Sequence, residues 1–233
     1  MHKVEIINDD NMNIELEKES VDIVFSDYIY EDTNFQWVEK YWEYVKPGRF
    51  FIAMTDFHSL FEFGYFMKYN IGANFVNHIV WKNEWGNHSK DRMHQCFDDI
   101  IVFSKGNHQV FNSDKIQVPK ATVNKKLNPS GRQTKTSTAF WSDICLTTTS
   151  KERIKDLETG KLFKWQKPLA LMQRIMDAYS NEGDFIVDNF MGIGGLAEWS
   201  FINNRNYLGI EYDKNRFVAA KNRLEKLGWK YEQ

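Results

Sequence analysis

The sequence predicts one α/β domain, built on a mostly parallel β-sheet with helices on both faces. The chain has 233 residues, of which 42% are hydrophobic and 27% charged, so it is long and apolar enough for one large domain. Its short apolar segments alternate with segments of helical periodicity. That alternation is typical of parallel sheets, because parallel strands need a crossover between them.

The first 105 residues contain five predicted strands and two predicted helices. Residues 21–25 (Val-Asp-Ile-Val-Phe) are mostly apolar and β-branched, as expected for a strand buried in a parallel sheet. The first helix carries Trp37, Tyr41 and Tyr44 at helical spacing, and Lys46-Pro47-Gly48 ends it. The strands are expected at residues 4–7, 21–25, 50–54, 75–81 and 97–104, and the helices at 34–45 and 59–69.

Residues 105–165 have a different composition. From residue 115 to residue 142 there are six basic residues and no acidic one, with many Thr, Ser, Asn and Gln. Hydrophobic periodicity is lost, so this segment is expected to be a long loop or insertion rather than core. Phe140 and Trp141 are expected to anchor its end to the domain.

Regular structure resumes at Lys167 and Pro168, where the proline suits the first turn of a helix. An apolar stripe at 3.6-residue spacing runs from Leu169 to Tyr179. The remaining elements are expected as strands at residues 185–187 and 207–210, and as helices at 196–202 and 214–227.

A glycine-rich loop follows the strand at residues 185–187. Gly192, Gly194 and Gly195 allow the backbone to adopt positive φ angles and to pass close to a ligand. Glu211 ends the next strand about twenty residues further on, where a carboxylate can accept hydrogen bonds from ribose hydroxyls. The pattern indicates an adenosine-type ligand rather than a dinucleotide, because the third glycine of the dinucleotide fingerprint is absent. The alternative is an ordinary tight turn with Glu211 merely exposed.

These residues resemble the amino-directed DNA methyltransferases of the β group, which act on adenine N6 or cytosine N4. The resemblance rests on residues 167–172 (Lys-Pro-Leu-Ala-Leu-Met), 188–195 (Asp-Asn-Phe-Met-Gly-Ile-Gly-Gly) and 209–211 (Gly-Ile-Glu), which follow the family's order. Asn and Gly stand at 189 and 195, where the family pattern has Pro and Thr. The resemblance implies a Rossmann-like fold that binds S-adenosyl-L-methionine. The residues that it assigns to this cofactor are Asp9, Lys167, Asp188, Phe190, Gly192, Gly194, Gly195 and Glu211.

The resemblance also assigns a catalytic motif. Residues 26–30 (Ser-Asp-Tyr-Ile-Tyr) follow an apolar strand and are similar to the family's Asp-Pro-Pro-Tyr motif. The similarity implies that Asp27 and the carbonyl of Tyr28 accept the two N–H groups of the target amine. It further implies that Tyr30 stacks on a base flipped out of the duplex. Tyr28 and Ile29 replace two prolines, whose fixed φ would hold the turn, so packing has to hold it here.

The basic segment lies where this family carries its target-recognising region. The chain then divides into a catalytic half (1–105), a target-recognition insertion (106–165) and a cofactor-binding half (166–233). Lys and Arg side chains contact phosphates, and Arg and Gln also read base edges. The residues expected to contact double-stranded DNA are Lys125, Lys126, Arg132, Gln133 and Lys135. The alternative is a solvated loop.

Composition limits the remaining choices. The net charge of −2 excludes a wholly basic nucleic-acid surface but not a local basic patch. Cys96 and Cys145 match no metal spacing and no disulfide framework, and the histidines form no metal-ligand pattern, so a reducing, cytoplasmic location without a metal is expected. No apolar run approaches the roughly 20 residues that cross a bilayer. Eight tryptophans are compatible with a homodimer.

Three functional hypotheses follow. The first is a site-specific DNA methyltransferase, with adenine N6 favoured over cytosine N4 because Asp27 stands where the cytosine enzymes tend to have Ser. The second is a degenerate methyltransferase that binds DNA, cofactor or a partner without turnover. The third is methylation of an amine on RNA or on a small molecule, and the basic segment argues against the small molecule.

Overall fold

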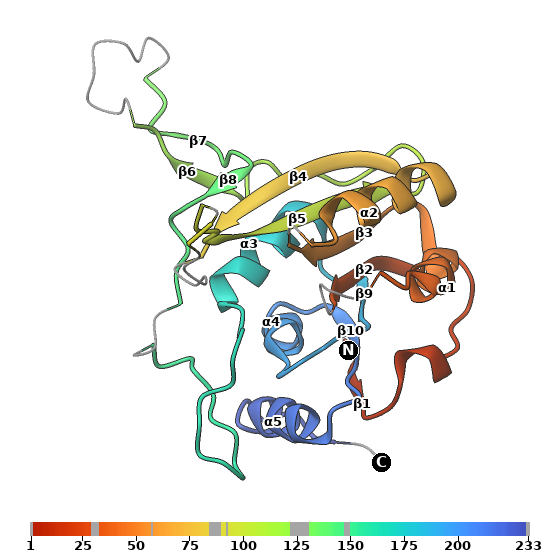
Figure 1. The fold of residues 1–233 in the computed structure, drawn as a ribbon, viewed down its shortest axis with the longest axis vertical. Helices are drawn as coiled ribbons and strands as arrows, with labels where there is room; N and C mark the ends of the chain where they lie inside the picture. Colours follow the sequence, from red (N-terminus) through yellow and green to blue (C-terminus); the bar gives the residue numbers. More distant parts are fainter. Residues whose placement is uncertain are drawn as a thin grey trace.

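The computed structural model describes residues 2–28, 33–56, 58–83, 90–91, 93–121, 131–146 and 150–231. Their main element is an eight-stranded sheet with the order β1-β10-β9-β2-β3-β5-β4-β8, which runs through the middle of the molecule (Figure 1). Its strands are β1 (Val4–Ile7), β10 (Asn206–Ile210), β9 (Phe185–Asp188), β2 (Val21–Asp27), β3 (Val45–Thr55), β5 (Phe97–Ser104), β4 (Asn74–Lys82) and β8 (Phe140–Trp141).

Five neighbouring strands, from β1 through β10, β9 and β2 to β3, are parallel to one another. β5 is antiparallel to both of its neighbours, β3 and β4, while β8 is parallel to β4. The predicted fold class, a mostly parallel α/β sheet, is confirmed. Parallel strands end at the same edge, so the loops after β1, β2, β9 and β10 meet at one edge of the sheet.

Helices cover both faces of this sheet. α3 (Leu169–Tyr179), α4 (Gly195–Ile202) and α5 (Lys214–Glu225) lie on one face, and α1 (Gln36–Tyr44) and α2 (Leu60–Tyr65) on the other (Figure 1). The helix expected at residues 59–69 is present, but its second half is π-helical: α2 continues without a break as η2 (Phe66–Asn70). α1 ends where β3 begins at Val45, so the expected turn at residues 46–48 lies inside a strand. Within the described residues no helix combines the length and the apolar character needed to span a bilayer.

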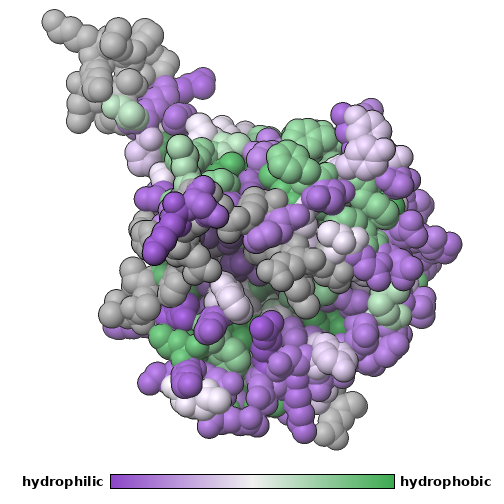
Figure 2. Space-filling view, viewed as in Figure 1, coloured by the Kyte–Doolittle hydropathy of each residue, from purple (hydrophilic) through white to green (hydrophobic). Residues whose placement is uncertain are grey.

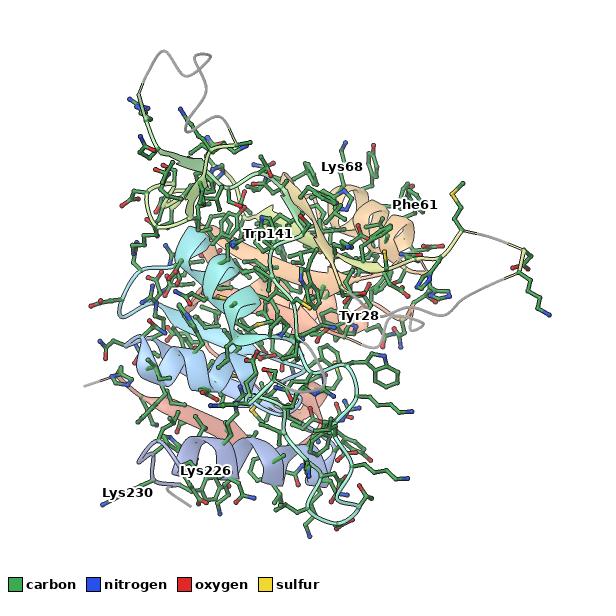
Figure 3. The ribbon with its side chains drawn as sticks, turned by 90° about the vertical axis from the view of Figure 1, so that its left-hand side faces the viewer. Tyr28, Phe61, Lys68, Trp141, Lys226 and Lys230 are labelled. Carbon is green, nitrogen blue, oxygen red and sulfur yellow. The ribbon has the colours of Figure 1, made fainter. Side chains whose placement is uncertain are left out.

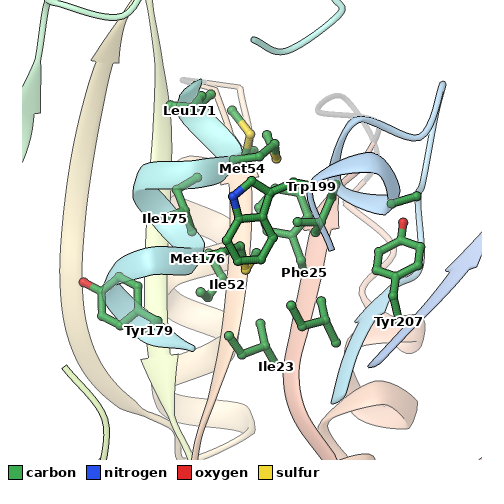
Figure 4. Close-up of a cluster of buried hydrophobic side chains, with 14 of the residues drawn as sticks. Ile23, Phe25, Ile52, Met54, Leu171, Ile175, Met176, Tyr179, Trp199 and Tyr207 are labelled. Carbon is green, nitrogen blue, oxygen red and sulfur yellow. The ribbon is translucent and has the colours of Figure 1, made fainter. Parts of the chain in front are cut away.

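The larger hydrophobic core lies between the sheet and α3 and α4. Trp199 of α4 packs in this cluster with Ile175 of α3 and with Phe25 and Met54 of the sheet (Figure 4). Ile175 is fully buried, as are Leu171 and Met176, whereas Leu169 at the helix start is only partly covered. The predicted apolar stripe is therefore the buried face of α3, and it fixes the residues just before the helix against the edge of the sheet.

The segment 105–165 differs in part from the loop that the sequence predicts. Its described residues include an antiparallel hairpin, which we call the arm, formed by β6 (Gln117–Pro119) and β7 (Thr134–Thr136). The arm projects from the body of the molecule, and its described surface is mostly hydrophilic (Figure 2). Beyond it, β8 joins the main sheet beside β4, and Ile116 and Ile144 lie in the larger core.

One of the two expected anchors of this segment is confirmed. Trp141 is 3% exposed, lies within the body of the domain (Figure 3), and its ring contacts the guanidinium of Arg174 on α3. Phe140 is 59% exposed, so the expectation that it anchors the segment is wrong. Successive side chains of a strand point to opposite faces, so burying Trp141 in β8 turns Phe140 outward.

Candidate active site

The loops at the carboxyl edge of the parallel strands are bonded directly to one another. The Asn8 side chain, after β1, donates to the carbonyl of Glu211 after β10, with a distance of 2.7 Å. Ser26 near the end of β2 donates to the side-chain oxygen of Asn189 after β9, at 2.6 Å. These contacts hold the expected catalytic strand end and the glycine loop at one edge, although more than 150 residues separate them in the chain.

The glycine loop has the backbone conformation that its sequence predicts. Gly192 has φ +59° and Gly194 has φ +72°, both in the left-handed region that favours glycine. A Cβ atom on Gly194 would lie 2.8 Å from the Cβ of Ala220 on α5, so glycine also permits the close approach of α4 and α5. A Cβ on Gly192 would meet no described atom within 4 Å, so this part of the loop faces open space. Gly195 begins α4.

Glu211 is 8% exposed, which contradicts the alternative that it is merely an exposed turn residue. Its Oε2 accepts a hydrogen bond from the backbone N–H of Gly192 at 2.7 Å, and its Oε1 accepts one from Asp213 at 2.8 Å. Burial raises the pKa of this carboxyl, while the two backbone donors lower it. Glu211 thus ties the end of β10 to the glycine loop, and each oxygen keeps a second lone pair for another donor.

Asp188, the last residue of β9, is 3% exposed. Its Oδ2 accepts a hydrogen bond from the hydroxyl of Tyr207 at 3.0 Å. Burial raises the pKa of Asp188 to about 8, although the Tyr207 hydroxyl opposes this, and the charge of Asp27 raises it further. Asp188 Oδ1 and Asn189 Nδ2 are buried with no hydrogen-bond partner among the described residues. Such atoms are costly to bury, so they indicate a place where a ligand supplies the partners.

Two further expected cofactor residues occupy different surroundings. Phe190 packs edge-on against Trp37, with 5.0 Å between ring centroids, at the inner side of the same loop. The carboxylate of Asp9 accepts hydrogen bonds from the backbone of Asp10 and from the side chain of Asn13, at 2.7 and 2.8 Å. Asp9 therefore closes the turn that follows β1.

The expected catalytic motif begins at the end of β2, where Asp27 is its last residue. Tyr28 is 3% exposed and lies in the interior (Figure 3), where its ring stacks on Phe63 with 5.4 Å between centroids. Its hydroxyl donates to Thr55 at 3.0 Å and is hydrogen-bonded to Ser59 at 2.8 Å. The side chain of Tyr28 thus fixes this residue in the absence of proline. Ile29 and Tyr30 lie outside the described residues.

The ammonium of Lys167 lies between two carboxylates. Its Nζ lies 3.3 Å from Oδ1 of Asp27 and 3.6 Å from Oδ2 of Asp98 on β5. Asp98 is not among the site residues that the sequence predicts. The only signal was an acidic residue beside the apolar run of a predicted strand, and that signal does not reveal a partner 69 residues away.

Three of the residues expected to contact DNA are described. Arg132, Gln133 and Lys135 are exposed on and beside β7, in the arm. Lys125 and Lys126 lie outside the described residues. In the described part of the chain, no group of three or more His, Cys, Asp or Glu side chains is arranged to hold a metal ion.

A comparison with known protein families identifies the class of protein to which this chain belongs. A family model for DNA methylases matches residues 8–222, so the chain belongs to this family of DNA methylases. Among curated relatives, the type II methyltransferase M.HinfI of Haemophilus influenzae is 26% identical over 207 residues. That match covers 87% of this chain, which spans only 54% of the length of the relative.

Solved structures share the fold. The M1.HpyAVI–SAM complex, which contains S-adenosyl-L-methionine, has a TM-score of 0.64 and 23% identity, covering 94% of this chain and 98% of the other. The cytosine-N4-specific PvuII DNA methyltransferase has a TM-score of 0.72 and 13% identity, covering 95% and 87%. The predicted membership in the amino-directed DNA methyltransferases is confirmed.

Proposed function

We propose that this chain transfers a methyl group from S-adenosyl-L-methionine to the exocyclic amine of a base flipped out of double-stranded DNA. The observation that carries the proposal is the position of Asp27 beside the glycine loop and Asp188, at one edge of the sheet. In open α/β sheets ligands bind outside the carboxyl ends of the strands. Membership in the DNA methylase family makes DNA the substrate to test first.

The residues at this edge fit the cofactor. The methionine end of S-adenosyl-L-methionine carries an ammonium group, which suits the unpartnered Oδ1 of buried Asp188. Glu211 keeps lone pairs for the ribose hydroxyls, and the open space in front of Gly192 leaves room for a ligand. Phe190, Gly194 and Gly195 shape the loop, while Lys167, which is paired with two carboxylates, is left out of this set.

The cofactor, when bound, supplies a methyl group on a positively charged sulfonium, ready for transfer. The protein has then to hold the target amine, so most of its contribution is positioning. The carboxylate of Asp27 and the carbonyl of Tyr28 would accept the two N–H groups and direct the nitrogen lone pair at the methyl carbon. Burial raises the pKa of Tyr28 to about 12, so its hydroxyl stays neutral and continues to anchor the motif.

Two finer parts of the proposal rest on single features. Asp27 favours adenine N6 over cytosine N4, since the cytosine enzymes of the resembled family tend to have Ser there. The exposed Arg132, Gln133 and Lys135 of the arm support DNA contact by this hairpin. A cytoplasmic location belongs to the same proposal. Light scattering tests whether the chain forms a homodimer.

The test is transfer of labelled methyl from S-adenosyl-L-methionine to unmethylated duplex DNA, followed by digestion and nucleoside mass spectrometry. N6-methyl-2′-deoxyadenosine is the expected product, and N4-methyl-2′-deoxycytidine would correct the target atom. Asp27→Ala is expected to abolish transfer while cofactor binding, measured by calorimetry, persists. Cofactor binding without transfer by the wild-type protein would contradict the proposal and favour the degenerate alternative.

A further inference from the structure

Asp98 and Lys167 stand beside the proposed catalytic carboxylate because of the register of the sheet. β3 lies between β2 and β5, and Asp27 is opposite Met54, which is opposite Ile100. Neighbouring strands are about 4.8 Å apart, so the backbones of β2 and β5 are separated by roughly 10 Å. The side chains of Asp27 and Asp98 are therefore too far apart for a direct hydrogen bond.

A third side chain fills the gap between the two carboxylates. Side chains alternate along a strand, so Asp27 and Asp98 lie on the same face as Met54 and Ile100, which pack in the core beneath α3. Lys167 precedes the first residue of α3 by two positions and enters from that layer. Its ammonium reaches both carboxylates, at 3.3 and 3.6 Å.

The cluster is sheltered from water. The side chains of Lys167, Asp98 and Asp27 are 11%, 18% and 25% exposed. Burial opposes the charge of Lys167, but the two carboxylates outweigh it and raise the pKa of its ammonium. Asp98 is also hydrogen-bonded by the side chain of Asn83, which is buried. Burial raises the pKa of Asp98, whereas Lys167 lowers it and Asp27 raises it.

We propose that Asp98 is a positioning residue for methyl transfer, because it shares the ammonium of Lys167 with Asp27 and so fixes the direction of the Asp27 carboxylate. The proposal rests on the proposed function. Lys167 holds Oδ1 of Asp27, and this contact sets the direction in which the carboxylate accepts the target amine. Charged groups facing Asp27 among the described residues are Lys167, Asp98 and, from β9, Asp188.

The consequence of removing Asp98 follows from this sharing. In Asp98→Asn the lysine loses a carboxylate partner, so it pairs more strongly with Asp27 and draws that carboxylate away from the amine. Misplacement of a reacting group by about 1 Å can lower a rate by about a hundredfold. Cofactor contacts are made elsewhere, at Asp188, Glu211 and the glycine loop, so the affinity for the cofactor should not change.

The activity experiment measures kcat and KM for methyl transfer by the wild-type protein and four variants. Asp98→Asn and Lys167→Met should lower kcat at least about tenfold, with KM for the cofactor within about twofold. Asp98→Glu should recover part of the lost kcat, since it restores the charge. The matched control is Glu43→Gln, which removes a carboxylate that pairs with Lys18 on the exposed surface. Its kcat should equal that of the wild type.

A second measurement does not depend on activity. The side-chain carboxyl carbon of Asp98 is titrated by NMR in the wild type, in Lys167→Met and in Asp27→Asn. The pKa of Asp98 should rise when Lys167 is removed and fall when Asp27 is neutralised, because these two groups act on it in opposite directions. Identical titrations in all three proteins would overturn the shared-lysine arrangement.

The outcomes separate the two proposals. A wild-type protein that transfers no methyl overturns the proposed function, and the role of Asp98 with it. A wild-type protein that is active, with Asp98→Asn as fast as the wild type, overturns only the role of Asp98. Loss of kcat in Asp98→Asn with the control unchanged and partial recovery in Asp98→Glu supports it.

Discussion

At the scale of single residues, the proposed contact between buried Asp188 and the cofactor ammonium would link cofactor binding to pH. Burial raises its pKa to about 8, so below that pH the ligand-free protein holds a proton there. A ligand ammonium beside Oδ1 favours the ionised carboxylate and lowers this pKa. Binding the cofactor therefore releases a proton, and affinity has to increase as the pH rises toward 8.

We predict that the dissociation constant for S-adenosyl-L-methionine falls between pH 6 and pH 7.5, by at most about tenfold per pH unit. Calorimetry in two buffers of different ionisation enthalpy measures both the affinity and the released proton. Asp188→Asn cannot ionise, so its binding should be weaker and should lose this pH dependence. A wild-type affinity that is constant over the range would show that Asp188 does not face the ammonium.

At the scale of elements, two glycines of one loop serve different purposes. Gly192 and Gly194 both have positive φ, so a side chain at either position costs roughly 1–2 kcal/mol in backbone strain. Only Gly194 adds a clash, with Ala220 at the contact between α4 and α5. Gly192 instead faces open space in front of the loop, where the proposed cofactor has room.

We predict that Gly194→Ala lowers the free energy of unfolding more than Gly192→Ala, by roughly 1–3 kcal/mol of overpacking. Gly192→Ala should instead weaken cofactor binding at a smaller cost in stability. Denaturant unfolding and calorimetry measure the two effects. Gly64→Ala in α2 is the control, since its φ is not positive and its Cβ would meet nothing within 4 Å. Equal loss of stability in both loop variants would contradict the assignment.

The elements also show what the sequence predicts and what it leaves out. Strands such as β2 and β9 are predicted because a run of apolar residues is a local signal. Asp27 and Asp188, which come after the predicted runs at 21–25 and 185–187, are the last residues of these strands. β8 was missed, because its two residues become a strand only through pairing with β4, about 60 residues earlier. The contact of Lys167 with Asp98 depends on long-range register in the same way.

The anchoring of the expected catalytic motif is predicted only in part from the sequence. The absence of proline at positions 28 and 29 predicts that packing has to hold the turn. The sequence does not identify the anchors, because Thr55 ends β3, Ser59 precedes α2, and both reach Tyr28 only in the folded protein. A local motif therefore indicates which residues to propose for the chemistry, and the tertiary structure determines what supports them.

At the scale of the whole molecule, the distribution of charge matters more for DNA binding than the net charge does. The chain has a net charge of −2, so attraction to DNA has to come from a local basic region. The arm carries exposed Arg132 and Lys135 and stands apart from the eight-stranded sheet (Figure 1). Charge can therefore be removed from the arm without disturbing the core or the site at the edge of the sheet.

We predict that replacing both Arg132 and Lys135 by Ala weakens binding to duplex DNA similarly for all sequences and reduces its salt dependence. Each lost phosphate contact lowers the slope of log K against log salt by about 0.9, so two contacts lower it by about 1.8. Fluorescence anisotropy between roughly 50 and 200 mM salt measures the slope. The control replaces Lys226 and Lys230, which are exposed at the opposite end of the molecule (Figure 3). It removes the same charge, so an equal loss of slope in the control would show that net charge, rather than the arm, governs DNA binding.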